Sequence, residues 1–273
     1  MSWGGVRYDG IEPLIDPPMV RGAKGRWLPD SDVVFGIELD GEVVAYPKRV
    51  MEVHEMVNAS VGGRRIAVPY CTLCGTATAW LTDDLGGGAP LELRTSGLLQ
   101  RSNKLMFDTR HESLWDQFDG AALTGRWLRR DAELTRVPVT TTTWGAWREA
   151  HPGSTLVRED GGLIRTYVAD PLRGRDAEGP IFHVGEIDPR LPAQTEVFGV
   201  TTPDGTRVAF PAERTRKLLE QGRPVTFRSI ELRSSDGGLA AMTADDDVLP
   251  SQTVFWFAWS QFNPGTLLWP DDA

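Results

Sequence analysis

The sequence predicts a β-rich α+β fold built from two degenerate copies of one mixed strand and helix unit, packed as one body. Glycine (29) and proline (19) are frequent and the chain has ten tryptophans, which favours many turns between short strands over a helical bundle. The chain also repeats itself weakly. VFGIELDGEVVAYP at 34–47 resembles VFGVTTPDGTRVAFP at 197–211, and WGAWREAHPGSTLV at 144–157 resembles WFAWSQFNPGTLLW at 256–269. Two long copies indicate an ancestral duplication rather than a solenoid of short repeats.

The repeat divides the chain into four segments. We expect an irregular, proline-rich N-terminal arm over residues 1–31 and a first repeat over 32–160. A connector over 161–196 leads to a shortened second repeat over 197–273, which contains no cysteine or histidine. If the duplicated fold needed these residues to form, both copies would carry them. Their restriction to the first copy therefore favours a functional role.

The first repeat supplies the clearest element signals. Two β-rich runs at 32–47 flank Asp40-Gly41, which predicts a hairpin. Residues 48–58 follow Pro47 with apolar residues at helical spacing, so we expect a helix there. The remaining expected elements are strands at 64–70, 76–82, 90–97 and 104–109, a turn at 85–88, and a helix at 141–153 that ends at Pro152-Gly153.

Charge and composition limit the partners. The net charge of −9 and the pI of about 5.0 argue against nucleic acid or an anionic membrane, since both require basic patches. They say little about a small-molecule substrate, which is the partner that the enzyme hypothesis below implies. No window approaches the roughly 18 apolar residues of a membrane helix, and the start of the chain does not resemble a signal peptide. We therefore expect a cytoplasmic protein. That compartment is reducing, so a structural disulfide is a poor explanation for cysteines.

Both cysteines of the chain, Cys71 and Cys74, lie in VPYCTLCGTATAW at 68–80. One interpretation is a metal site, because thiolates at this spacing can chelate one ion and His54, the histidine closest in the chain, can add a third ligand. Such a site keeps a coordination position open, as catalytic sites do. A second interpretation is a thiol–disulfide pair, although reactive pairs usually begin a helix and the residues that follow here are β-rich. The third is a pair of buried thiols that act as small apolar residues.

The four histidines are less informative. His54 can be a ligand, a catalytic base or a hydrogen-bonded structural residue. His111 lies in the polar segment DTRHESLW and could contact a substrate. His151 precedes Pro152 and is expected to help end a helix, and the sequence does not place His183.

The segment 94–120 alternates polar residues with large apolar ones. This pattern predicts either a pocket lining, in which a few polar groups orient a ligand, or a half-buried hairpin with a solvated face. Nowhere does the chain carry a glycine-rich phosphate loop, a G-x-S-x-G elbow or a dinucleotide-binding fingerprint.

Several separated blocks together resemble the bacterial and archaeal family catalogued as domain of unknown function 3179. They are DVVFGIELDGEVVAYPKRVMEVHEMVN, VPYCTLCGTATAW, SGLLQRSNKLMFDTRHESLWDQ and FWFAWSQFNPGTLLW, and they span about Asp32 to Trp269. The chain departs from the family pattern at Thr72, where proline is usual, and around His111. The resemblance points to the residues His54, Glu55, Asn58, Cys71, Cys74, Ser96, Asn103, Asp108, Ser113, Trp115 and Gln117.

The leading hypothesis is a cytoplasmic metalloenzyme whose metal is held by Cys71, Cys74 and His54. Copper is favoured, with zinc or iron as alternatives, because these metals accept sulfur ligands. Copper or iron would imply oxidation of a small molecule by dioxygen, and the arginine-rich, lysine-poor composition would fit a specialised metabolite. Zinc would imply hydrolysis or a lyase reaction. The rivals are a non-catalytic metal carrier or sensor and a thiol–disulfide oxidoreductase.

Further site residues complete this hypothesis. The catalytic candidates are Glu55, His111 and Ser113. The candidates for the substrate pocket are Asn58, Ser96, Asn103, Asp108, Arg110, Trp115 and Gln117.

Overall fold

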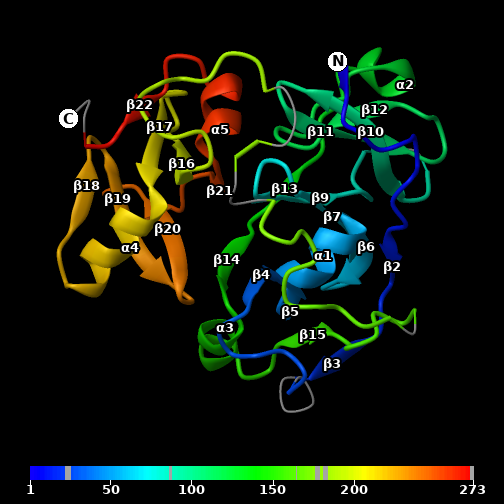
Figure 1. Cartoon of the computed structure of the whole chain (residues 1–273), viewed down its shortest axis with the longest axis horizontal. Coiled ribbons are helices and arrows are strands. Elements are labelled where there is room, and N and C mark those ends of the chain that lie inside the picture. Colours follow the sequence, from blue (N-terminus) through cyan, green and yellow to red (C-terminus); the bar gives the residue numbers. More distant parts are fainter. Residues whose placement is uncertain (22–25, 86–87, 164, 176–178, 181–183, 271–273) are drawn as a thin grey trace.

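The fold is a five-bladed β-propeller made of five small sheets, with 39% strand and 13% helix. The structure is a computed structural model (Figure 1). The structure describes residues 1–21, 26–85, 88–163, 165–175, 179–180 and 184–270. The predicted α+β fold of two copies is therefore wrong. We name each blade after one of its strands.

The β4 blade contains the predicted hairpin. Its strands, in order across the sheet, are β14 (Thr140–Thr143), β4 (Val33–Leu39), β5 (Glu42–Pro47), β15 (Thr155–Val157) and β3 (Met19–Arg21). The turn between β4 and β5 places Asp40 at φ 47° and Gly41 at φ 82°, the backbone that tight hairpins require. The hairpin prediction at 32–47 is confirmed.

Two helices of the β4 blade are shorter than predicted. Helix α1 (Lys48–His54) begins after Pro47, but Glu55 adopts the left-handed conformation and ends it. The chain then enters a strand, where Met56 pairs with Pro69. Helix α3 (Trp144–Ala150) is capped by Thr143, whose hydroxyl accepts the Ala146 N–H. In both cases residues predicted as helical pair as strands instead: 56–58 in β6 (Met56–Val61), after α1, and 141–143 in β14, before α3.

The β16 blade reproduces the strand order of the β4 blade. Its strands are β21 (Ser251–Phe255), β16 (Glu196–Thr201), β17 (Arg207–Pro211) and β22 (Leu267–Leu268), with helices α4 (Ala212–Glu220) and α5 (Trp256–Phe262). In each blade a strand glycine lies under a helix tryptophan, Gly36 under Trp147 and Gly199 under Trp259. A Cβ on either glycine would approach the ring to 2.4 or 2.2 Å. The sequence repeat is therefore a likeness between two blades of five, which is why it misled the prediction for the whole chain.

The β7 blade carries both cysteines at the end of its central strand. Its strands are β13 (Arg136–Val137), β9 (Ala79–Leu81), β7 (Arg64–Cys71), β6 (Met56–Val61) and β2 (Leu14–Ile15), and β8 (Thr76–Ala77) pairs with β7. The predicted strands 64–70 and 76–82 are confirmed, the second with an interruption at Thr78.

The two remaining blades complete the fold. The β11 blade contains β1 (Ser2–Trp3), β10 (Leu93–Gln100), β11 (Asn103–Asp108) and β12 (Leu114–Asp116), followed by helix α2 (Gly125–Leu128). The β19 blade contains β18 (Val225–Phe227), β19 (Ile230–Ser235) and β20 (Gly238–Met242). The predicted strands 90–97 and 104–109 correspond to β10 and β11.

The blades divide into two groups in Figure 1. The β16 and β19 blades (yellow to red) lie on one side, and the β4, β7 and β11 blades lie on the other. Contacts between the groups include two hydrogen bonds: the Thr142 hydroxyl donates to the Asp236 carbonyl at 2.9 Å, and the Phe255 N–H donates to the Cys74 carbonyl at 2.8 Å. The second of these brings the β16 blade against the cysteines. No helix of the described residues is long and apolar enough to cross a membrane.

Candidate functional site

A tight turn at the end of β7 holds the two cysteines. The Cys74 N–H donates to the Cys71 carbonyl at 3.2 Å, which closes the turn. Gly75 continues it at φ 62°, and a Cβ there would lie 2.9 Å from the Phe255 ring. Glycine is therefore required both by the backbone and by the packing of β21.

The cysteine sulfurs lie 3.0 Å apart and are both free thiols. Cys71 is 1% exposed and Cys74 is fully buried. The Cys74 thiol also donates to the Ser102 carbonyl at 3.0 Å. That carbonyl belongs to the turn between β10 and β11, so the β11 blade holds one of the two sulfurs in place.

The two thiols have opposite acidities. Burial and the Glu55 charge would raise the pKa of the Cys71 thiol. The hydrogen bond with Cys74, together with the charge and backbone N–H of Lys104, outweighs them, and the pKa is lowered. Burial raises the pKa of the Cys74 thiol well above its usual value, and the hydrogen bond and charge of Cys71 raise it further. The site therefore stabilises a thiolate on Cys71 and a thiol on Cys74.

A buried ion pair lies beside Cys71. The Lys104 ammonium, 3% exposed as a residue, donates to the Glu55 carbonyl at 2.8 Å, to Glu55 Oε2 at 3.0 Å and to the Tyr70 carbonyl at 3.1 Å. The other carboxylate oxygen of Glu55 accepts the Thr72 hydroxyl at 2.9 Å. All three ammonium protons have acceptors, so the pair is neutral and internally satisfied.

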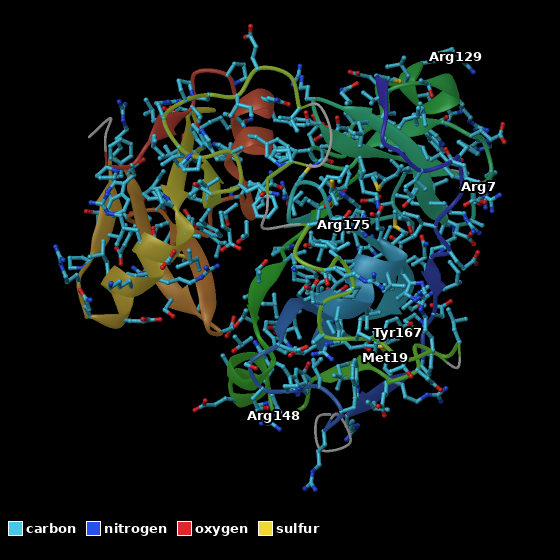
Figure 2. The ribbon with its side chains drawn as sticks, in the orientation of Figure 1. Arg7, Met19, Arg129, Arg148, Tyr167 and Arg175 are labelled. Atoms are coloured by element: carbon cyan, nitrogen blue, oxygen red, sulfur yellow. The ribbon has the colours of Figure 1, made fainter. Side chains whose placement is uncertain are left out.

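Cys71, Glu55 and Lys104 line one cavity of about 280 Å³, which we call the cysteine cavity. Its other walls come from the N-terminal segment, strand β10 and the chain before β16: Gly4, Gly5, Val6, Thr72, Leu73, Thr95, Gly97, Leu98, Leu99, Leu172, Arg175, Pro180 and Gln194. Figure 2 shows Arg175 near the middle of the view.

Two buried polar side chains near the cysteines lack ordinary partners. Thr95 lines the cavity, and its hydroxyl has no hydrogen-bond partner within the described chain. Asn103 lies against Cys74, where its amide opposes the rise of the thiol pKa, yet neither amide atom forms a well-shaped hydrogen bond to a described residue.

His54 lies away from the cysteines. Its Nδ1 is 2.7 Å from the Glu12 carbonyl and its Nε2 is 2.8 Å from the Tyr167 hydroxyl. Burial lowers the pKa of the ring. Figure 2 labels Tyr167 below α1. Both ring nitrogens therefore have hydrogen-bond partners. These contacts match the third role suggested by the sequence, that of a hydrogen-bonded structural histidine.

The three-ligand metal site is not assembled in the described structure. No group of three histidine, cysteine, aspartate or glutamate side chains among the described residues could hold an ion. His183 lies outside the described residues, and His151 packs on Trp147 at the end of α3.

Several predicted site residues organise the β11 blade instead of facing the cysteine cavity. The buried Asp108 carboxylate accepts the His111 N–H at 2.6 Å, the Ser113 N–H at 3.2 Å and the Trp115 Nε1–H at 3.2 Å. This arrangement closes the loop between β11 and β12. Arg110 donates to the Ala89 carbonyl at 2.8 Å, on the same side of the blade.

Three further candidates link strands. The Asn58 amide bridges β6 to β10 by two 2.9 Å hydrogen bonds with the Leu93 backbone. The Ser96 hydroxyl donates to the Leu105 carbonyl at 2.7 Å across an irregular step in the pairing of β10 with β11. The Gln117 amide donates to the Thr76 carbonyl at 3.2 Å, just beyond the cysteine turn.

The structure therefore brings together Glu55, Cys71, Cys74 and Asn103 from the predicted set. It adds Lys104, Thr72 and Thr95, which sequence reasoning did not select. One signal was available for Lys104: it directly precedes the apolar run Leu105, Met106 and Phe107 in one strand, and a buried lysine needs an acidic partner.

Comparison with known proteins identifies a family but no function. No curated protein and no solved structure matches the chain significantly. One family model matches residues 8–248, most of the sequence. The chain belongs to the family described as Protein of unknown function (DUF3179), as its sequence blocks indicated.

Proposed function

We propose that the protein is a thiol–disulfide oxidoreductase in which Cys71 is the attacking nucleophile and Cys74 the resolving cysteine. The observation that carries the proposal is the asymmetry of the pair. Two free thiols lie 3.0 Å apart, and only the one with the lowered pKa, Cys71, lines a cavity. The thiolate is the reactive form of cysteine, so the favoured thiolate is the one that a substrate can reach.

The reaction is an exchange of two electrons. The Cys71 thiolate attacks one sulfur of a substrate disulfide, which breaks that bond and forms a mixed disulfide with Cys71. Cys74 then attacks the Cys71 sulfur, which forms the Cys71–Cys74 disulfide and releases the second substrate sulfur. One released thiolate takes the proton of Cys74, and the other takes from solvent the proton that Cys71 lost when it ionised. The substrate is reduced to thiols, and a dithiol reductant returns the protein to its starting state.

Neighbouring groups support each step. The hydrogen bond with Cys74 is the largest contribution that favours the Cys71 thiolate, and the Lys104 ammonium partly offsets the opposing charge of Glu55. Cys74 keeps its proton until the mixed disulfide exists, because burial and the hydrogen bond and charge of Cys71 raise the pKa of its thiol. A reducing cytoplasm, the compartment that we expect from the sequence, would maintain the pair as thiols between turnovers.

Copper-dependent oxidation stays a prediction, and the donor geometry fits it less well. Two sulfurs bound to one ion at about 2.3 Å and a tetrahedral angle lie about 3.7 Å apart, against 3.0 Å here. His54 would also have to leave the Glu12 carbonyl and the Tyr167 hydroxyl.

The test uses 5,5′-dithiobis(2-nitrobenzoate), a disulfide whose released thiolate is coloured. We expect the chain to release about two equivalents and to form an internal Cys71–Cys74 disulfide, which dithiothreitol reverses. Cys74→Ser should release about one equivalent and keep a mixed disulfide on Cys71. Cys71→Ser should react slowly.

Two results would contradict the proposal. The first is a wild-type chain that carries the reagent on both cysteines without an internal disulfide. The second is a stable one-to-one copper(I) complex, resistant to the competing chelator bicinchoninate, in a chain whose cysteines do not oxidise reversibly. The second result would favour the copper hypothesis instead.

A further inference from the structure

A second cavity, of about 520 Å³, lies between the β7 and β16 blades, and it holds three arginines. We call it the arginine cavity. Arg136 of β13 and Trp80 of β9 form one side, and Gln252 of β21 and Trp259 of α5 form the other. The remaining lining residues are Arg101, Phe118, Asp119, Glu133, Leu134, Thr135, Gly199, Thr201, Arg207, Pro250, Ser251, Phe262 and Asn263.

The arginines of this cavity have no carboxylate partners among the described residues. Arg136 donates to the neutral Gln252 amide oxygen and stacks 5.5 Å above the Trp80 ring. Arg101 lies 5.4 Å above the Phe262 ring. Arg207 donates to the Asn263 amide oxygen at 3.0 Å and to the Gly205 carbonyl at 3.4 Å.

Arginines elsewhere on the molecule include two kinds. Arg64 and Arg148 pair with Asp83 and Asp30 at 2.7 and 2.9 Å, whereas Arg110 and Arg175 donate to the Ala89 and Leu172 carbonyls. The arginine cavity differs in that three arginines without a carboxylate partner among the described residues surround one cavity. In a chain with a net charge of −9, three guanidinium groups left unpaired around one cavity need a physical reason. A bound anion would supply it, because guanidinium groups match the geometry of carboxylates and phosphates.

The other lining groups narrow the ligand to a monoanion with a flat apolar body. Asp119 and Glu133 also line the cavity, so three positive and two negative groups leave a net charge of one. A doubly charged phosphate would meet both carboxylates at close range, whereas a carboxylate matches the single surplus charge. The rings of Trp80, Trp259 and Phe118 line the cavity with 1, 2 and 6% exposure, so they offer a narrow apolar wall rather than open stacking faces. The cavity volume lies in the range of small-molecule sites.

We infer that the arginine cavity is a binding site for an aromatic carboxylate, with Arg136 as the anchor of its carboxylate group. This site is separate from the thiol chemistry, so the inference does not depend on the redox role of Cys71. Burial lowers the pKa of Arg136 to about 10, with Asp119 opposing the shift, so the anchor is charged at neutral pH.

Calorimetric titration with matched probes tests this inference. The probes are 3-phenylpropanoate and indole-3-acetate, each compared with its neutral amide. At least one acid should bind about tenfold or more tightly than its amide, a difference of about 1.4 kcal/mol. Arg136→Gln should remove this preference, and Arg101→Gln, at an exposed position, should weaken it.

The matched control is Arg148→Gln. Arg148 also lies over a tryptophan ring, that of Trp144, but sits on α3 at the lower edge of the molecule in Figure 2. This variant should keep the full preference for the acid. The inference is overturned if neither acid binds more tightly than its amide at up to about 10 mM. It is also overturned if the preference survives both Arg136→Gln and Arg101→Gln.

Discussion

The cysteine cavity and the arginine cavity adjoin the same buried apolar cluster. Cys71 of this cluster lines the cysteine cavity, and Phe118 and Trp259 line the arginine cavity. The two cavities differ in how their central cations are paired. In the cysteine cavity the Lys104 ammonium has three acceptors, one of them the Glu55 carboxylate, and the Arg175 guanidinium donates to the Leu172 carbonyl. In the arginine cavity none of the three guanidinium groups has a carboxylate partner among the described residues. The cysteine cavity thus presents a thiol beside an ion pair, whereas the arginine cavity presents three guanidinium groups together.

The largest effect expected at neutral pH is on the buried ion pair. Lys104→Met should lower the free energy of unfolding by about 2–3 kcal/mol, because it leaves the half-buried Glu55 carboxylate, 14% exposed, with the Thr72 hydroxyl but without its cation. It should also raise the pKa of Cys71, since the Lys104 charge lowers it. Urea denaturation gives the first quantity, and the pH dependence of thiol alkylation gives the second.

A double variant provides the control for this prediction. Glu55→Gln combined with Lys104→Met removes both charges, so it should cost less than the sum of the two single changes. If Lys104→Met and the double variant were both as stable as the wild type, the ion pair would contribute nothing to the fold. The contrast between the two cavities would then lose its basis.

The next effect depends on pH and concerns Asp116, a buried carboxyl near Arg101 and Asp119 of the arginine cavity. Burial raises its pKa to about 7, and the charge of Asp119 adds to the rise. The folded state thus holds a proton that the unfolded chain releases from a pKa near 3.8. Stability should therefore fall as pH rises between these values, by up to about 4 kcal/mol.

Asp116→Asn should flatten this part of the pH profile, because the amide does not titrate. It also keeps an acceptor for the Phe118 N–H, which the Asp116 carboxylate accepts at 2.7 Å. Thermal unfolding of both proteins from pH 4 to pH 8 measures the difference. An unchanged slope in the variant would show that Asp116 titrates normally.

The smallest expected effect is on stability when Arg136 of the arginine cavity is replaced. Arg136→Gln should change the free energy of unfolding by less than about 1 kcal/mol, because no ion pair is lost and glutamine can still bond Gln252. A loss as large as that for Lys104→Met would mean that Arg136 serves the fold rather than a ligand.

The sequence predicted individual strands and turns better than it predicted how the sheets are arranged. The Asp40-Gly41 hairpin and the strands on either side of the cysteines follow from turn chemistry and β-branched runs. The number of blades does not follow. Only the β4 and β16 blades keep a recognisable common sequence, through a glycine under a helix tryptophan, whereas the other three share strand pairing and little else.

The site was predicted in part, for a similar reason. The cysteine spacing and the family pattern pointed to Cys71, Cys74, Glu55 and Asn103. Proximity in the chain suggested His54, but α1 ends in a left-handed residue, so His54 and Glu55 have different partners: His54 meets Tyr167, and Glu55 meets Lys104. The Lys104 partner comes from strand β11, about fifty residues later, and only the strand register brings it there.

The most direct test of the central claim measures the alkylation rate of each cysteine as a function of pH. Iodoacetamide labelling at Cys71 and at Cys74 can be quantified separately by peptide mass spectrometry. We predict that Cys71 reacts first, with a midpoint below that of an ordinary thiol near 9, and that Cys74 stays unreactive until well above it. Equal midpoints, or faster labelling of Cys74, would contradict the assignment of Cys71 as the nucleophile.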